Sequence, residues 1–206
     1  MPCACDHDCS LDRLRERQRN TLRAVLAINA VMFFVIAAAA LHAGSSALLS
    51  DSLDNLGDAF TYALSLYAVA RGAATKARVA LVKGVLILLG ACVVLAQIGH
   101  RLIEPGVPLF EVMGAFSLLG LAANGLCLFL LWRHRHEDVN MSSVWECSRN
   151  DIAANLSVFA AAGGVWLTGS GWPDLLVAGA LALLLLRSAA RVIGNARAEL
   201  RAAPAG

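Results

Sequence analysis

Six apolar stretches follow one another along the chain, and short polar segments separate them. Their approximate bounds are Leu22–Leu41, Ser46–Ala70, Val79–Ile98, Val107–Trp132, Ser143–Leu167 and Pro173–Ile193. A helix needs about 20 mostly apolar residues to cross a bilayer, and the stretches have roughly that length or more. The pattern therefore predicts an all-α, polytopic membrane protein with six transmembrane helices. The second and fifth stretches are the least apolar of the six.

The composition agrees with a membrane protein and excludes two soluble classes. Apolar residues make up 58% of the chain and charged residues 16%, whereas a soluble domain is about a quarter charged. The six cysteines are scattered, and three of them lie inside apolar stretches, so a secreted disulfide framework is not expected. We expect the lipid bilayer as a partner, and no nucleic acid.

Basic residues predict the orientation of the helices. If both termini are cytoplasmic, only Arg101 of the seventeen Lys and Arg residues falls on the outer side. Cytoplasmic segments of membrane proteins carry this excess of Lys and Arg. We therefore expect an N-in/C-in, multi-pass protein of a bacterial cytoplasmic membrane. Its six-helix unit covers residues 21–193, between an N-terminal tail of residues 1–20 with a Cys/His cluster and a short tail of residues 194–206.

The second stretch contains three aspartates, Asp51, Asp54 and Asp58. Inserting each of them into a membrane costs about 2.5–3.5 kcal/mol, so ionisable residues inside spans are candidates for a functional site. Their spacing of three and four residues places them on one face of a helix. Asp54 and Asp58 are one turn apart and are placed to bind one cation together.

The fifth stretch repeats this spacing with Cys147, Asp151 and Asn155. The second and fifth helices should run antiparallel across the membrane, which would bring Asp54 level with Asp151 and Asp58 level with Cys147. These four residues form the predicted metal site, with three carboxylates and one thiolate. The alternative is a structural network of polar side chains.

One layer further out, Asp51 should be level with Asn155, which would give the site a polar approach from the outer side. Four ligands in tetrahedral geometry suit Zn²⁺, and a thiolate favours Zn²⁺, Cd²⁺ or Co²⁺ over harder ions. Mg²⁺ and Ca²⁺ are not expected, because they require six or more oxygen ligands. Ligands bind metal only when deprotonated, so protons compete with the metal for the same groups.

These motifs resemble the cation diffusion facilitators, a family of metal-ion/proton antiporters. The segment SSALLSDSLDNLGDAFTYALSLYAVARG resembles the family's second span, whose pair of ligands falls on Asp54 and Asp58. The fifth-span pair falls on Cys147 and Asp151, with Cys where the family usually has His or Asp. The resemblance covers residues 20–193 and implies a transporter rather than an enzyme. It implies export of a divalent metal in exchange for protons, no cofactor, and a possible homodimer.

Two functions from other classes remain open at this point. A membrane-embedded metal-binding or scaffold protein would show the same motifs and transport nothing. A membrane metalloenzyme would need an open metal position and a separate acid or base. No His-rich set in the apolar stretches supplies such a group.

The N-terminal segment contains a second set of metal-capable side chains, namely Cys3, Cys5, His7 and Cys9. Three thiols and one imidazole could capture a soft metal ion in the reducing cytoplasm. The alternative is a loosely ordered chain end without metal.

Several residues inside the spans have simpler predicted roles. Cys92 and Cys127 are expected to be buried packing residues, because unpaired cysteines are commonly buried. Asn29 and Asn124 are expected to bond between helices. Asp174 opens the sixth stretch directly after Pro173, where a carboxylate suits the positive end of the dipole of its own helix.

Overall fold

The structure, a computed structural model, describes residues 4–68, 73–132 and 139–202. Within these ranges it leaves out the side chains of residues 4–15, 18, 65, 68, 73–76, 79, 139–149 and 202. The described residues form helices and no strand. The helices are α1 (Ala4–Ala43), α2 (Ser46–Ala68), α3 (Ala73–Ile103), α4 (Phe110–Trp132), α5 (Val139–Thr168) and α6 (Trp172–Ala202). The predicted all-α polytopic fold is confirmed.

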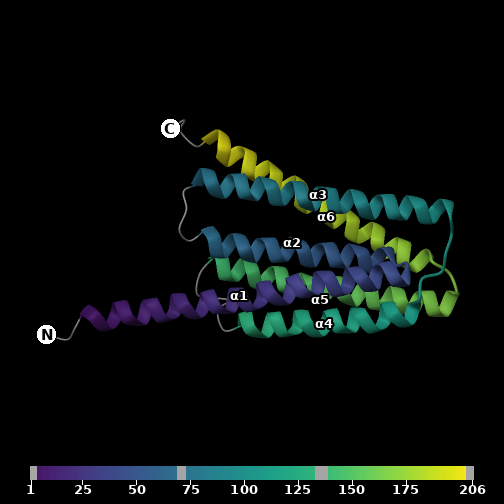
Figure 1. Cartoon of the computed structure of the whole chain (residues 1–206), viewed down its shortest axis with the longest axis horizontal. Coiled ribbons are helices and arrows are strands. Elements are labelled where there is room, and N and C mark those ends of the chain that lie inside the picture. Colours follow the sequence, from purple (N-terminus) through teal and green to yellow (C-terminus); the bar gives the residue numbers. More distant parts are fainter. Residues whose placement is uncertain (1–3, 69–72, 133–138, 203–206) are drawn as a thin grey trace.

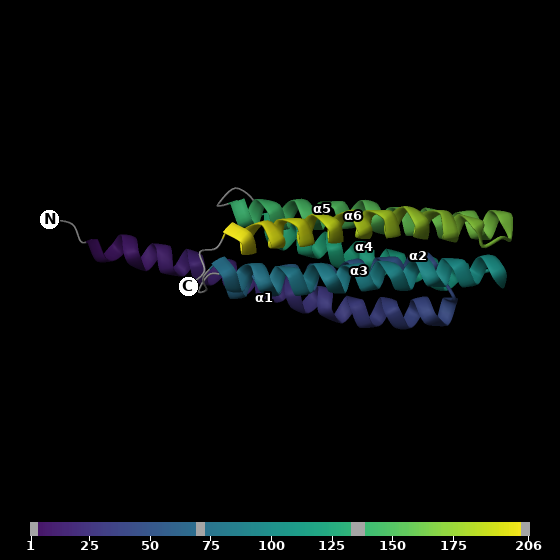
Figure 2. The same ribbon diagram turned by 90° about the horizontal axis from the view of Figure 1, so that it is seen from above.

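Among the described residues, five helices are long and apolar enough to cross a membrane. The exception is α2, in which the three aspartates interrupt the apolar sequence. The helices extend most of the predicted stretches by a few residues, and α1 extends its stretch the most. From Ala4 onward the N-terminal segment continues directly into the first span as one helix, and it projects beyond the other helices (Figures 1 and 2).

The six helices pack chiefly as three pairs, α1 with α2, α3 with α6 and α4 with α5. Helix α2 also packs against α3, α5 and α6, so it has neighbouring helices on several sides. This central place removes the polar face of α2 from lipid, which explains how a span with three aspartates is accommodated. Both ends of the chain lie toward the same end of the bundle (Figure 1), as an even number of spans requires.

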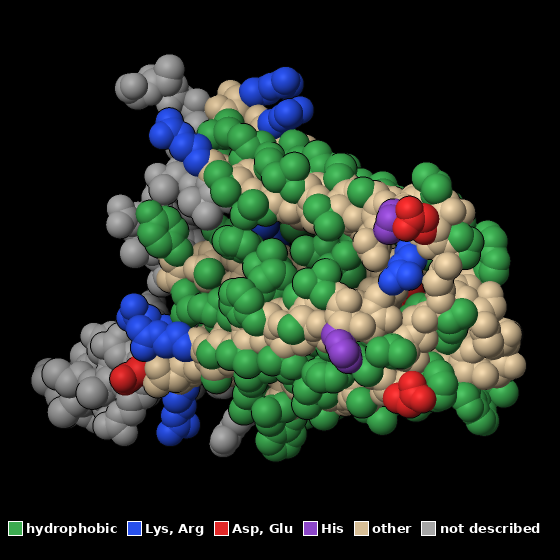
Figure 3. Space-filling model, turned by 45° about the vertical axis from the view of Figure 1, so that its right-hand side comes forward, with side chains coloured by type: hydrophobic (Ala, Val, Ile, Leu, Met, Phe, Trp, Pro, Cys, Tyr) green, Lys and Arg blue, Asp and Glu red, His purple; other side chains and the backbone are tan. Residues whose placement is uncertain are grey.

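Small and branched apolar side chains form the main core. Ile36 of α1, Leu48 of α2, Met113 of α4, Val158 of α5 and Ala178 of α6 are fully buried in one cluster. Alanines fill much of the rest of that cluster, which lets the helix backbones approach closely. On the face that Figure 3 shows, hydrophobic side chains cover much of the middle, and most of the visible Lys and Arg side chains gather toward the end that carries the chain termini.

Two glycines in left-handed conformation end helices opposite the chain termini. Gly44 has a φ of 64° after α1, and Gly169 has a φ of 61° after α5. A residue with a side chain adopts this conformation only at a cost, so glycine is favoured there. After Gly44 the chain reverses at once into α2, which places the first turn of α2 deep among its neighbours.

The structure corrects one of the packing predictions. Cys127 is buried as expected, but Cys92 is exposed on the surface of α3, so its prediction as a buried packing residue was wrong. Asn29 of α1 is 2% exposed and donates hydrogen bonds to the Val25 carbonyl oxygen at 3.0 Å and to the Cys127 sulfur at 3.8 Å. The second bond links α1 to α4, as predicted for this residue.

Candidate functional site

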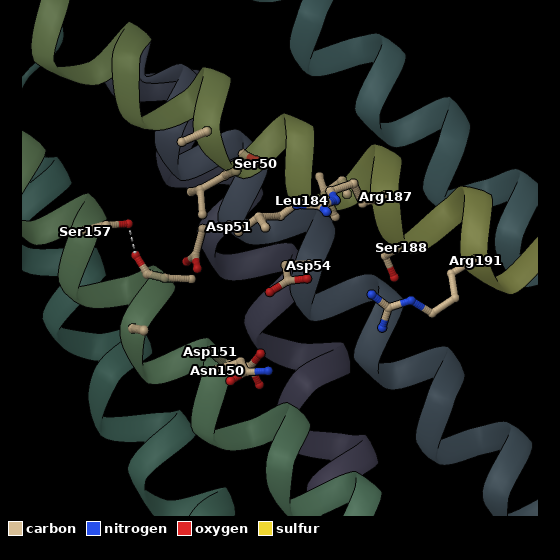
Figure 4. A pocket seen from close by; sticks show the side chains of 15 residues that line it. Ser50, Asp51, Asp54, Asn150, Asp151, Ser157, Leu184, Arg187, Ser188 and Arg191 are labelled. Carbon is tan, nitrogen blue, oxygen red and sulfur yellow. Dashed lines mark hydrogen bonds between the residues drawn. The ribbon is translucent and has the colours of Figure 1, made fainter.

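A cavity of about 750 Å³ lies between α2, α5 and α6. Asp51 and Asp54 of α2 and Asp151 of α5 line one part of it, and Arg187 and Arg191 of α6 line another (Figure 4). The carboxylates therefore come from the two helices on which the sequence predicted a cation site. The arginines belong to the half of α6 nearer the chain termini.

Four carboxylates act on one another around this cavity. The side chain of Asp151 comes within hydrogen-bonding range of Asp58, and it also interacts electrostatically with Asp54 and Asp51. Asp51, Asp58 and Asp151 are only 2%, 5% and 7% exposed. Like charges this close and this poorly solvated are unfavourable unless a cation or a proton lies among them. The arrangement is therefore suited to binding positive charge.

Unpartnered oxygen atoms mark the same place. Among the described residues, one buried carboxylate oxygen of Asp51 and one of Asp151 have no hydrogen-bond partner, and the Ser50 hydroxyl has none either. All three residues line the cavity. Buried polar atoms are nearly always paired in proteins, because leaving one unpaired costs roughly 1–3 kcal/mol. A bound cation would satisfy these oxygens.

Asp151 lies near aspartates of more than one predicted layer. It interacts most strongly with Asp58 and also with Asp54, with which the sequence placed it level. Asn155 is fully buried and donates a hydrogen bond to the backbone oxygen of Asp151 at 3.0 Å. Its amide oxygen faces α4, where a side chain at Gly120 would overlap it. Asn155 thus lies between α5 and α4 and is not among the residues that line the cavity. Its predicted outer layer with Asp51 stays a prediction.

The remaining predicted ligands lie outside the described side chains. Helix α5 includes Cys147 one turn before Asp151, but its side chain is not described. Among the described residues, no group of three or more His, Cys, Asp or Glu side chains is arranged to bind a metal ion. The described carboxylates alone are thus not a complete metal site.

The N-terminal set also lies outside that description. Cys3 precedes the first described residue, and the side chains of Cys5, His7 and Cys9 are left out although α1 includes their backbone. The predicted capture of a soft metal by these four residues therefore stays a prediction.

Two kinds of basic residue near the site were not predicted from the sequence. For Arg187 and Arg191 the sequence predicted only a cytoplasmic location, although their four-residue spacing places them on one face of α6. The same was predicted for Lys83 of α3, yet its ammonium donates a hydrogen bond to the Thr61 hydroxyl of α2. The available signal was the position of Lys83 inside an apolar stretch, where ionisable residues are functional candidates.

Asp174 caps the N-terminal end of α2. Its carboxylate accepts hydrogen bonds from the Ser45 hydroxyl at 2.6 Å and from the backbone N–H groups of Ser46 and Ala47 at 2.8 and 3.1 Å. Backbone N–H groups at the start of a helix have no partner within the helix, so a carboxylate stabilises them. Asp174 thus caps α2 in addition to lying in the first turn of α6. The charge of Arg101 acts on the same carboxylate.

Comparison with known proteins agrees with this architecture. A family model described as the cation efflux transmembrane domain matches residues 22–200. No curated protein matches the chain significantly. The match begins within α1 and ends within α6, so it includes the aspartates of α2 and α5. The chain therefore belongs to the cation efflux family, the cation diffusion facilitators, whose transmembrane domains carry metal cations out of the cytoplasm.

Proposed function

We propose that this protein exports Zn²⁺, Cd²⁺ or Co²⁺ from the cytoplasm in exchange for protons. The transported ion would be held by Asp54, Asp58, Cys147 and Asp151. The observation that carries the proposal is the meeting of α2 and α5 carboxylates at one cavity, with buried oxygen atoms of Asp51 and Asp151 that have no partner.

The ligand types support a transition metal. Three carboxylates and a thiolate provide the four ligands that Zn²⁺ takes in tetrahedral sites. The thiolate would favour softer ions such as Cd²⁺ relative to a site with His or Asp at that position. Asp51 lies one turn from Asp54 on the cavity wall and would guide the ion to or from the site.

The crowding of carboxylates supports proton exchange. When the metal leaves, the four negative charges repel one another in a poorly solvated place, and protons are the available replacement. Metal and protons would therefore occupy the site in turn. Such exclusion produces antiport if the site opens to one side of the membrane at a time.

The two ends of α2 support a direction of opening. Asp174 ties α6 to the start of α2 at one end, while the cavity extends along α6 as far as Arg191, toward the end with the chain termini. With both termini in the cytoplasm, this cavity would admit metal from the cytoplasmic side. Reporters fused at Gly206 and inserted near Arg101 should therefore report opposite sides of the membrane.

Metal flux into inverted membrane vesicles tests the proposed function. An imposed proton gradient, acidic inside, should drive Zn²⁺ uptake, and an uncoupler should abolish it. Asp54→Asn should reduce uptake to background. The matched control is Glu104→Gln, which removes a carboxylate whose side chain is 74% exposed at the other end of the bundle. Zn²⁺ uptake that ignores the proton gradient would reject antiport, and Zn²⁺ binding without flux would favour a metal-binding scaffold.

A further inference from the structure

A lysine lies against the acidic helix within the membrane. Lys83 is on α3 inside the apolar span Ala80–Ile103, and its side chain is partly buried. Its ammonium group donates a hydrogen bond to the hydroxyl of Thr61, which in turn donates to the Gly57 backbone oxygen at 2.9 Å. Lys83 is therefore held on α2 by a specific contact.

That contact places the ammonium on the face of α2 that carries the carboxylates. Thr61 follows Asp54 by seven residues and Asp58 by three, so all three lie along the same side of the helix. The charge of Lys83 acts on the Asp54 carboxylate. The hydrogen bond and the electrostatic interaction thus place one fixed positive charge beside the proposed metal site.

A positive charge in this position opposes the binding of another cation. Coulomb repulsion between a lysine and a divalent ion is weakly screened where water is scarce. A lysine inside a span is also costly in itself unless carboxylates are near. A site selected only for tight binding would therefore gain from an uncharged residue here. A transporter has a different need, because an ion that is bound too tightly leaves too slowly.

We propose that Lys83 is an internal counter-charge that weakens metal binding at the α2–α5 carboxylates and so speeds release of the ion. It would offset part of the negative charge of the carboxylates both with and without metal. This inference rests on the proposed function, since it concerns the affinity and turnover of that same site. The rival role for Lys83 is a structural tether between α3 and α2 through Thr61.

Three substitutions distinguish the effect of the Lys83 charge from the effect of its contact with Thr61. Lys83→Gln removes the charge and keeps a hydrogen-bond donor for Thr61. Lys83→Arg keeps the charge, and Thr61→Val removes the tether while leaving Lys83 in place. All three can be compared with the unchanged protein in lipid nanodiscs, where thermal unfolding shows whether each variant is folded.

Equilibrium Zn²⁺ binding and vesicle transport provide the measurements. Lys83→Gln should bind Zn²⁺ about tenfold more tightly, with KM and the maximal rate both lowered, as expected when repulsion is removed and release slows. Lys83→Arg should have a Zn²⁺ affinity, a KM and a maximal rate close to those of the unchanged protein. The absorption spectrum of bound Co²⁺ should keep its shape in Lys83→Gln, because the ligands themselves do not change.

The outcomes distinguish this inference from the proposed function. If Asp54→Asn abolishes Zn²⁺ binding but Lys83→Gln binds as the unchanged protein does or more weakly, the counter-charge role is wrong and the transport site stands. If Thr61→Val reproduces the effect of Lys83→Gln on unfolding and affinity alike, Lys83 is a tether. If the unchanged protein binds no Zn²⁺ or Co²⁺, both proposals fail.

Discussion

Buried aspartates occur in two regions of this bundle, and their surroundings differ. Asp174, at the end of α6 opposite the chain termini, is 1% exposed and accepts three hydrogen bonds from Ser45, Ser46 and Ala47 where α2 begins. Asp51 and Asp151, at the cavity, are buried almost as completely, and each has a buried oxygen without a partner. Burial alone therefore does not reveal what a carboxylate does in this protein.

The two regions differ in the groups that donate hydrogen bonds to each carboxylate. The donors of Asp174 are a hydroxyl and two backbone N–H groups that would otherwise have no partner where α2 begins. Its hydrogen bonds join α6 to the start of α2 and engage both carboxylate oxygens, which leaves little capacity for a ligand. The oxygens at the cavity instead remain available to a cation. We therefore infer that Asp174 stabilises the fold. The cavity carboxylates serve to bind a cation and reduce the stability of the fold.

The strongest test of this comparison exchanges carboxylate for amide at the cavity. Asp151→Asn should abolish Zn²⁺ transport, because a neutral amide supplies no negative charge to the ion. The variant should remain folded, and its thermal unfolding temperature should be unchanged or raised, since repulsion from Asp58 is relieved. Transport assays and thermal unfolding of the same purified sample measure both effects. Loss of folding without recovery in lipid would show that Asp151 is structural.

The second test removes the cap. Asp174→Ala should lower the free energy of unfolding by about 1–3 kcal/mol, because the N–H groups of Ser46 and Ala47 lose their acceptor in a buried place. Zn²⁺ affinity of the folded fraction should change much less than in Asp151→Asn. Asp174→Asn keeps one acceptor oxygen, so its free energy of unfolding should lie between those of the unchanged protein and Asp174→Ala. A stable Asp174→Ala protein that no longer binds metal would reverse the comparison.

The sequence predicted the cavity carboxylates more fully than it predicted Asp174. Aspartates in an apolar stretch are conspicuous, and four-residue spacing shows that they share a helix face. Asp174 also stood out, but the sequence related it only to the dipole of its own helix. Its partners lie 127 to 129 residues away. Only the packing of α6 against α2 brings these groups together.

The helices themselves followed closely from hydropathy, whereas their outward faces did not. Cys92 lies in an apolar stretch and was expected to be buried, but it is exposed. In a membrane the lipid-facing surface is as apolar as the core, so hydropathy does not separate the two. Lys83 and Arg187 were missed for a related reason, because a count of basic residues by side gives no information about which face of a helix they occupy.

A smaller and more selective effect is expected at Cys147. Cys147→Ala should weaken binding of every transported ion, and Cys147→His should keep Zn²⁺ transport while weakening Cd²⁺ relative to Zn²⁺. Cys147→Asp should shift the preference further toward harder ions. Parallel Zn²⁺ and Cd²⁺ uptake by inverted vesicles under a proton gradient measures the ratio.

The controls for Cys147 are the two other cysteines of the spans. Cys92→Ala should have no effect, because the side chain is exposed on α3, and Cys127→Ala should cost only some packing beside Asn29. If Cys147→Ala leaves both affinities and their ratio unchanged, three carboxylates must bind the ion without the thiol. The site would then depend on α2 and Asp151 alone.

The smallest effect is expected at the far N-terminus. Changing Cys3, Cys5 and Cys9 together to Ser should leave the maximal rate of Zn²⁺ uptake in place and raise the apparent KM slightly, if at all. The reason is the position of α1, which from Ala4 onward projects beyond the bundle (Figures 1 and 2). Metal held there would be concentrated near the protein without belonging to the carboxylate site. Uptake measured at low and at saturating Zn²⁺ separates the two effects. Complete loss of uptake would place the essential ligands at the chain end and not between α2 and α5.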